Sequence, residues 1–134
     1  GVLGHFIDRD GNQRAFRVLG SNLNKSADLP LVVLVGEETA SFGEIFSGIL
    51  QVENRAFVIG DPTGGNIELL WGYDFADGSR AWIARETFRP IANPKLDWEL
   101  QGIIPDLQAT SEWDQVTLAN DPVILAALGY FAGN

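Results

Sequence analysis

Cysteine and methionine are missing from the 134 residues, histidine occurs once and lysine twice. Without cysteine there is no disulfide framework, no thiol nucleophile and no thiolate metal site. The two lysines, Lys25 and Lys95, form no basic cluster of the kind that binds a phosphate backbone, and the formal net charge is −9. We therefore expect neither nucleic acid nor an anionic membrane surface as a partner.

Long apolar runs are missing too, and no stretch approaches the roughly 18 apolar residues that a membrane-spanning helix needs. The first residues, 1–4, have neither the basic flank nor the apolar core of a secretory signal, and there is no initiator methionine. We interpret the chain as a piece of a longer protein. No His or carboxylate cluster has metal-ligand spacing, and no phosphate-cradling loop follows a strand, so we expect no metal and no cofactor.

The apolar pattern that is present predicts an α/β domain, and no internal domain boundary stands out. Residues 2–7 and 14–19 flank a turn-forming cluster at 8–12, which predicts a hairpin. Residues 31–35 are a continuous apolar run typical of a strand buried on both faces. Helical spacing over 42–52 and a second apolar strand at 56–59 complete a β-α-β unit with parallel strands.

The second half of the chain is expected to be less regular. Residues 67–74 and 80–84 flank the turn pair Asp77-Gly78, which predicts another hairpin. A short strand is expected at 87–91, a loop at 93–98 and a turn-bounded apolar segment at 102–106. Asp121 followed by Pro122 predicts a helix that begins there and runs to about residue 132.

The most informative stretch, residues 39–44, places Ser41 between a predicted strand and a predicted helix. A serine there resembles a nucleophile elbow, with its hydroxyl projecting from the carboxyl end of the sheet. Unpaired N–H groups at the helix start could stabilise an oxyanion, and that of Phe42 is the natural first donor. However, Ser41 and Glu44 also fit a capping box that only ends the helix. Spacing alone does not separate the two interpretations.

Several motifs in a fixed order resemble the C-terminal-processing, or tail-specific, protease family, peptidase family S41. The resemblance covers residues 29–106. Its motifs are Val33-Leu34-Val35, the nucleophile turn with Glu44 three residues on, Arg55-Ala56, Ile59-Gly60, Pro62-Thr63, Asp77-Gly78-Ser79 and Gly102-Ile103-x-Pro105-Asp106. It implies a partial β-β-α superhelix of the caseinolytic protease/crotonase type, truncated at its N-terminal side, with residues 1–134 as the C-terminal part of the catalytic domain.

The resemblance also implies a serine-type endopeptidase that works through an acyl-enzyme on Ser41. Many members carry a general-base lysine in a Gly-Lys-Gly setting, whereas residues 63–66 here are Thr-Gly-Gly-Asn, with Asn66 at the lysine's place. An amide cannot accept the serine proton. The variant resembles the tricorn-like branch, where a histidine is the base and a glutamate orients it. Glu99 stands at that glutamate's position.

The base itself is not evident in the sequence. In the tricorn-like pattern, the histidine and a glycine-rich segment with the second oxyanion donor lie further upstream than residue 1. His5, the single histidine, is better explained as a structural or surface residue. We therefore expect the chain alone to be inactive. Gly64, Gly65 and Asn66 are expected to contact the substrate, although the glycines could serve only a tight turn.

Two functions without a serine nucleophile remain open. The fold's relatives include retinoid-binding repeats, so a non-catalytic peptide- or lipid-binding module is the main alternative. An acyl-handling enzyme of the crotonase type is the second. For the peptidase, the resemblance implies peptide or protein substrates and a bacterial periplasm or cell envelope setting. An exposed strand edge could also make the piece a homodimer.

Overall fold

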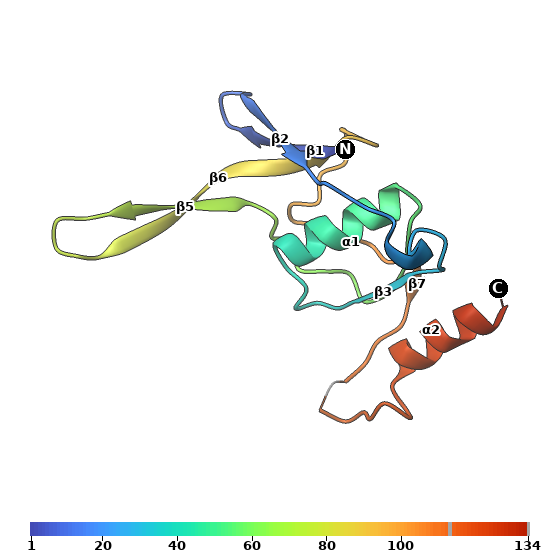
Figure 1. Ribbon diagram of the computed structural model, residues 1–134. Helices are drawn as coiled ribbons and strands as arrows, with labels where there is room; N and C mark the ends of the chain where they lie inside the picture. The colour runs from blue at the N-terminus through green and yellow to red at the C-terminus, as the bar shows by residue number, and fades with distance from the viewer. Residues whose placement is uncertain (113, 134) are drawn as a thin grey trace.

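The computed structural model describes residues 1–112 and 114–133, which form two small sheets with helix α1 between them (Figure 1). The antiparallel sheet has the order β2-β1-β6-β5 and the parallel sheet the order β3-β4-β7. The elements are β1 (Val2–Asp8), β2 (Gln13–Arg17), the 3₁₀ turn η1 (Leu23–Lys25), β3 (Val32–Val35), α1 (Phe42–Val52), β4 (Phe57–Gly60), β5 (Leu69–Asp74), β6 (Arg80–Pro90), β7 (Leu107–Gln108) and α2 (Pro122–Gly133).

The predicted β-α-β unit is present, with β3 and β4 parallel and in register from Val32 opposite Phe57 to Val35 opposite Gly60. One expectation about it is wrong. We expected β3 to be buried on both faces, but Leu34 is 46% exposed. The cause is that β3 lies at the edge of the parallel sheet. Helix α2 packs on the face that carries Val32 and Leu34 but does not cover the whole of it.

Both predicted hairpins are present, but β6, the second strand of the second hairpin, is longer than expected. Strand β6 continues to Pro90, so the separate strand predicted at 87–91 is instead the second half of β6. Its first half pairs with β5 and its second half with β1, where Phe88 lies opposite Phe6. The short strand β7, which pairs with β4, was not predicted. In Figure 1 the β5–β6 hairpin projects away from the rest of the molecule.

Aromatic and aliphatic side chains of both sheets form the main core with helix α1. The rings of Phe6 and Phe88 are 5.3 Å apart, and Phe88 stacks on Trp98 at 6.0 Å. Trp98 and Ile103 pack directly over Gly48 of α1, where any Cβ would lie only 2.6 Å from Ile103. Each of these buried side chains contributes about 1.5–3 kcal/mol. The core therefore fixes α1, and the residue that precedes it, relative to both sheets.

Helix α2 begins as predicted. The Oδ1 atom of Asp121 accepts a hydrogen bond from the N–H of Val123 at 2.9 Å, which is the N-cap arrangement. The ring of Tyr130 stacks on that of Phe57 at 4.6 Å, so the helix is attached to β4. Within the described residues, neither helix has the length and apolarity needed to span a membrane.

Candidate active site

Ser41 immediately precedes α1 and has an unusual backbone, with φ 56° and ψ −126°. An ordinary N-cap residue has extended dihedrals. A positive φ in a residue other than glycine costs about 1–3 kcal/mol and persists only where the surroundings impose it. Here the N–H of Ser41 donates to the carbonyl oxygen of Asn66 at 2.8 Å. Residues 36–40 separate β3 from Ser41, so what this junction shares with a nucleophile elbow is a strained serine at the start of a helix.

The capping-box interpretation is also supported in part. The Glu44 carboxylate accepts a hydrogen bond from the N–H of Ser41 at 3.1 Å, and the Ser41 side chain faces the N–H of Glu44. That N–H makes its well-formed bond to the carbonyl oxygen of Ser41 at 3.0 Å, and the hydroxyl makes no capping hydrogen bond. The helix therefore begins through backbone contacts and Glu44, and no strong capping bond holds the hydroxyl of the exposed Ser41.

Glu44 organises this corner of the molecule. Its side chain is fully buried, with 0% exposure. Besides the N–H of Ser41, its carboxylate accepts the hydroxyl of Thr63 at 2.5 Å and the N–H groups of Gly65 and Asn66 at 2.7 and 2.8 Å. Four donors satisfy the buried acid, as burial of such a group requires. The sequence indicated Glu44 as a capping-box member and as part of the family's nucleophile motif, and its role in holding loop 63–66 was missed.

Gly65 is needed for the shape of this loop. It has a φ of 67°, and an added Cβ would lie 2.7 Å from the backbone of Leu100. The N–H of Leu100 donates to the carbonyl oxygen of Gly65 at 2.9 Å, and the N–H of Ile103 donates to the Thr63 hydroxyl at 2.7 Å. The turn interpretation therefore holds for Gly65. Gly64 is exposed, and its N–H donates to the carbonyl oxygen of Thr39 at 2.9 Å.

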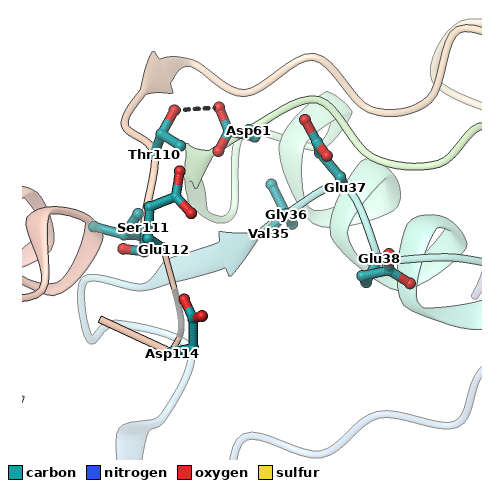
Figure 2. A pocket seen from close by; sticks show the side chains of 10 residues that line it. Val35, Gly36, Glu37, Glu38, Asp61, Thr110, Ser111, Glu112 and Asp114 are labelled. Carbon is teal, nitrogen blue, oxygen red and sulfur yellow. Dashed lines mark hydrogen bonds between the residues drawn. The ribbon is translucent and has the colours of Figure 1, made fainter. Parts of the chain in front are cut away.

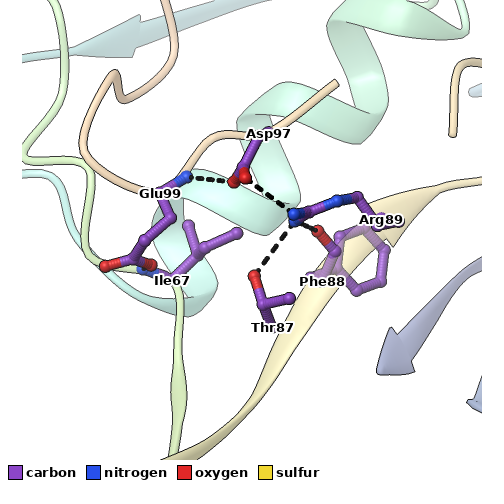
Figure 3. Close-up of polar contacts among 6 residues, drawn as sticks. All are labelled: Ile67, Thr87, Phe88, Arg89, Asp97 and Glu99. Carbon is purple, nitrogen blue, oxygen red and sulfur yellow. Dashed lines mark hydrogen bonds and ion pairs between the residues drawn. The ribbon is translucent and has the colours of Figure 1, made fainter. Parts of the chain in front are cut away.

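Glu99 lies beside the same loop. Its Oε2 atom accepts a hydrogen bond from the N–H of Ile67 at 3.0 Å. Desolvation raises the pKa of the Glu99 carboxyl, and three nearby carboxylates raise it further, whereas the bond from Ile67 lowers it. The N–H of Glu99 donates to Asp97, which forms an ion pair with Arg89 of β6 at 2.7 Å (Figure 3). Strand β6 therefore helps to position the segment that carries Glu99.

One peptide group links Ser41 to Glu99. The carbonyl oxygen of Asn66 accepts from Ser41, and the next N–H, that of Ile67, donates to Glu99. The C=O and N–H of a trans peptide point in opposite directions, so the two residues lie on opposite sides of this group. The Ser41 nitrogen and the Glu99 Oε2 atom are therefore no more than about 8 Å apart.

The N–H of Phe42 makes no hydrogen bond within the part of the chain that the structure describes. It is the first N–H of α1 and belongs to the residue after Ser41. It is therefore a free donor directly next to the serine. The ring of Phe42 lies 6.3 Å from that of Phe6, and this packing holds the start of the helix.

Across residues 1–112 and 114–133, no hydrogen bond joins Ser41 to His5, Lys25 or Lys95. His5 lies in β1 between Gly4 and Phe6, which are both buried. Side chains alternate along a strand, so His5 faces away from the side on which Phe6 meets Phe42. Lys25 and Lys95 are exposed. Asn66 occupies the position of the general-base lysine of many family members. It is exposed, and its N–H donates to the Glu44 carboxylate.

A second feature lies at the carboxyl ends of the parallel strands and was not predicted. It is a pocket of 740 Å³ whose lining includes five acidic residues, Glu37, Glu38, Asp61, Glu112 and Asp114 (Figure 2). Asp61 accepts the hydroxyl of Thr110 at 2.7 Å. Among the described residues there is no group of three or more His, Cys, Asp or Glu arranged to hold a metal ion.

Comparison with known proteins gives a consistent result. A family model described as "Peptidase family S41" matches residues 1–109. The carboxyl-terminal-processing peptidase 2 of Arabidopsis thaliana chloroplasts is 32% identical over 106 residues, which are 79% of this chain and 20% of that protein. The carboxyl-terminal-processing protease of Synechocystis sp. is 32% identical over 130 residues, which are 95% of this chain and 29% of that protein.

Comparison with solved structures also finds proteases of similar fold. The photosystem II D1 C-terminal processing protease matches with a TM-score of 0.73 and 27% identity, over 96% of this chain and 32% of that one. The tricorn protease matches with a TM-score of 0.60 over 98% of this chain and 12% of that one, and at 16% identity the likeness concerns the fold alone. The chain thus spans less than a third of the length of each of these relatives.

Proposed function

The chain belongs to peptidase family S41, and from this membership we propose that it is the nucleophile-bearing part of a serine-type endopeptidase domain. The observation that carries the proposal is the strained backbone of Ser41 at the start of α1, next to the unpaired N–H of Phe42. A serine needed only as a cap has no reason to take this conformation. We further propose that the elements described here form one part of a β-β-α superhelix.

The proposed reaction is acyl transfer to Ser41. A base removes the proton from its hydroxyl as the oxygen attacks the carbonyl carbon of a peptide bond. The negative charge that develops on the carbonyl oxygen is held by the N–H of Phe42 and a second donor. The base then protonates the departing amine and leaves an acyl-enzyme, which water hydrolyses to restore Ser41.

Glu99 is proposed to orient that base. The peptide group 66–67 holds the Glu99 carboxylate on one side and the Ser41 amide on the other, so the two residues are fixed relative to each other. A partly desolvated carboxylate also stabilises an imidazolium better than a solvated one does. We therefore propose a tricorn-like Ser-His-Glu arrangement whose histidine comes from outside residues 1–134. Asn66 rules out a Ser-Lys pair at the loop position.

Loop 63–66 is proposed to bind the backbone of the substrate beside Ser41. Gly64 and Asn66 are exposed, and Gly65 gives the loop its turn. Glu44 is proposed as the positioning residue that holds this loop against the N–H of Ser41. Since no histidine or lysine of the described residues is hydrogen-bonded to Ser41, we expect residues 1–134 alone to show no peptide hydrolysis above background in a fluorogenic assay.

Covalent labelling with a fluorophosphonate probe tests the proposal on the protein as its source organism makes it. We expect labelling of the wild type and its loss in Ser41→Ala. The matched control is Ser47→Ala, because Ser47 lies in the same helix but is buried, with its hydroxyl bonded to the Gly43 carbonyl at 2.8 Å. Labelling that survives Ser41→Ala would contradict the proposal. A folded, unlabelled protein that binds peptide or lipid tightly would favour a binding module. The presence of Asn66 where many family members have the general-base lysine is consistent with that alternative.

A further inference from the structure

Strand β5 is the outer strand of the four-stranded sheet, which has the order β2-β1-β6-β5. It pairs with β6 on one side, and within the described residues no backbone group bonds to its other side. An unpaired edge presents a row of N–H and C=O groups, which can receive another chain as an added strand.

The end of the hairpin identifies which backbone groups of β5 point outward. The N–H of Phe75 donates to the carbonyl oxygen of Ser79 at 2.9 Å, so Phe75 directs its groups toward β6. Directions alternate along an antiparallel strand. Tyr73 and Trp71 therefore also face β6, whereas the backbone groups of Leu70, Gly72 and Asp74 face outward.

Large side chains stand on both faces of this edge. Trp71 and Tyr73 lie on one face and are 45% and 42% exposed, and Trp82, opposite Gly72 on the other face, is 61% exposed. The Arg85 guanidinium lies 4.5 Å from the Trp71 ring centre, and that of Arg80 lies 5.4 Å from the Trp82 ring centre. Such aromatic surfaces suit the apolar side chains of an extended peptide.

The opposite edge of the same sheet is built differently. Strand β2 carries Arg14 and Arg17, and charged residues are the usual means of keeping an edge strand unpaired. Between residues 69 and 73, β5 has no charged residue and no proline. Its single irregularity is a shift of register between Leu69 and Leu70. The exposed edge of β5 therefore has little protection against pairing.

This edge also leads to the candidate active site. Strand β5 begins three residues after Asn66, whose carbonyl oxygen accepts the N–H of Ser41. We propose that the outer edge of β5 binds the polypeptide substrate in extended form, as a fifth strand that continues toward Ser41. The favoured substrate segment is one rich in β-branched and aromatic residues. The inference rests on the proposed peptidase function, because it names where that enzyme holds its substrate.

Hydrogen exchange of the individual amides tests the proposal directly. The sample is the protein as its source organism makes it, carrying Ser41→Ala so that cleavage plays no part. The probe is an acetylated, amidated peptide of eight residues that alternates valine and threonine. We expect the peptide to slow exchange severalfold at Leu70, Gly72 and Asp74. The amides of Trp71 and Tyr73 should not change, because they are already bonded to β6. Equal slowing at all five positions, or none at the three outward amides, would overturn the proposal.

A pair of variants supplies a second test. Leu70→Pro removes one outward N–H without removing a bond to β6, whereas Leu70→Ala keeps that N–H and shortens the side chain. We expect the proline variant to bind the peptide about tenfold more weakly and the alanine variant to stay within about threefold of the parent. If circular dichroism shows that Leu70→Pro does not fold, the hydrogen-exchange result on the protein without a substitution at Leu70 tests the proposal instead.

The edge could instead pair with a second copy of the chain. In that case, the outward amides would become protected without peptide as concentration rises, and light scattering would show a dimer. Either result would overturn substrate binding at this edge. The test is independent of the nucleophile. If the peptide protects the outward amides of β5 but the wild type is not labelled by fluorophosphonate, only the role of Ser41 is contradicted. If the wild type is labelled but these amides are not protected, only the inference about β5 is contradicted.

Discussion

The backbone of Ser41 is held in a conformation that glycine adopts freely and serine avoids. Serine is kept there at a cost in stability, which is how functional sites commonly differ from the rest of a fold. The sequence predicted Ser41, Phe42 and Glu99 as residues of one site. In the structure, Ser41 and Glu99 both bond to the peptide group 66–67, and Phe42 follows Ser41. The sequence could not show that Glu44 joins them, because four donors to one carboxylate come from segments that only the fold brings together.

Relief of that strain is measurable by comparing two variants that both lack the hydroxyl. Ser41→Gly should be more stable than Ser41→Ala by about 1 kcal/mol, since alanine keeps the unfavourable φ and glycine does not. Urea unfolding of the two variants gives the difference in free energy. If the alanine variant is the more stable, the strained conformation is not a property of the folded protein.

Glu44→Gln should be strongly destabilising. The Oε1 and Oε2 atoms each accept two hydrogen bonds, and an amide nitrogen in place of either would face two donors. We expect the free energy of unfolding to fall by about 2–4 kcal/mol. The control is Glu53→Gln at the exposed end of the same helix, which should change stability by less than about 0.5 kcal/mol. Equal stability of the two variants would contradict the role given to Glu44.

Glu99 makes a prediction about pH. Its pKa is raised in the folded state, so the folded protein binds the proton more tightly than the unfolded chain does. Its contribution to stability is therefore full below the unfolded pKa and is lost as pH rises through the folded pKa. Glu99→Gln removes this dependence. The stability of the wild type relative to Glu99→Gln, from thermal or urea unfolding, should fall as pH rises from about 4 upward. A relative stability that rises over that range would show the opposite shift.

At the scale of elements, periodicity located α1 at Phe42–Val52 and both hairpins, because these are local patterns. It divided β6 in two, because the strand changes partner midway from β5 to β1, and a partner change leaves no local signal. It also overestimated the burial of β3. An apolar strand reveals that it packs against something but does not reveal whether it lies at an edge.

Gly48 tests how closely α1 packs on the segment that leads to Glu99. In Gly48→Ala the new Cβ would lie 2.6 Å from Ile103 and 2.7 Å from Trp98. We expect a net loss of about 1–3 kcal/mol even though alanine favours helices. Gly129→Ala in α2 is the control, because nothing lies within 4 Å of its Cβ, and it should gain up to about 1 kcal/mol. Thermal unfolding measures both, and a gain at Gly48 would show that α1 packs more loosely than described.

At the scale of the whole molecule, three segments distant in sequence form the site: the start of α1, loop 63–66 and the turn at 98–103. The topology brings them together, because loop 63–66 follows β4, β4 pairs with the strand before α1, and β6 positions the last segment. Three of the ordered family motifs, the nucleophile turn, Pro62-Thr63 and the motif that starts at Gly102, fall on or beside these segments, which is why a resemblance in sequence could point to this candidate site. The acidic pocket beyond β3, β4 and β7 was not foreseen, because its carboxylates come from three segments that are distant in sequence: Glu37 with Glu38, Asp61, and Glu112 with Asp114.

The central claim is that Ser41 is the nucleophile of the S41 peptidase to which this chain contributes. The most direct measurement is tandem mass spectrometry of the fluorophosphonate-treated protein, which identifies the residue that carries the adduct. The account predicts a phosphonyl group on the Ser41 oxygen and on no other serine or threonine. An adduct confined to a different residue, or an unmodified Ser41 in a protein that cleaves peptides, would contradict it.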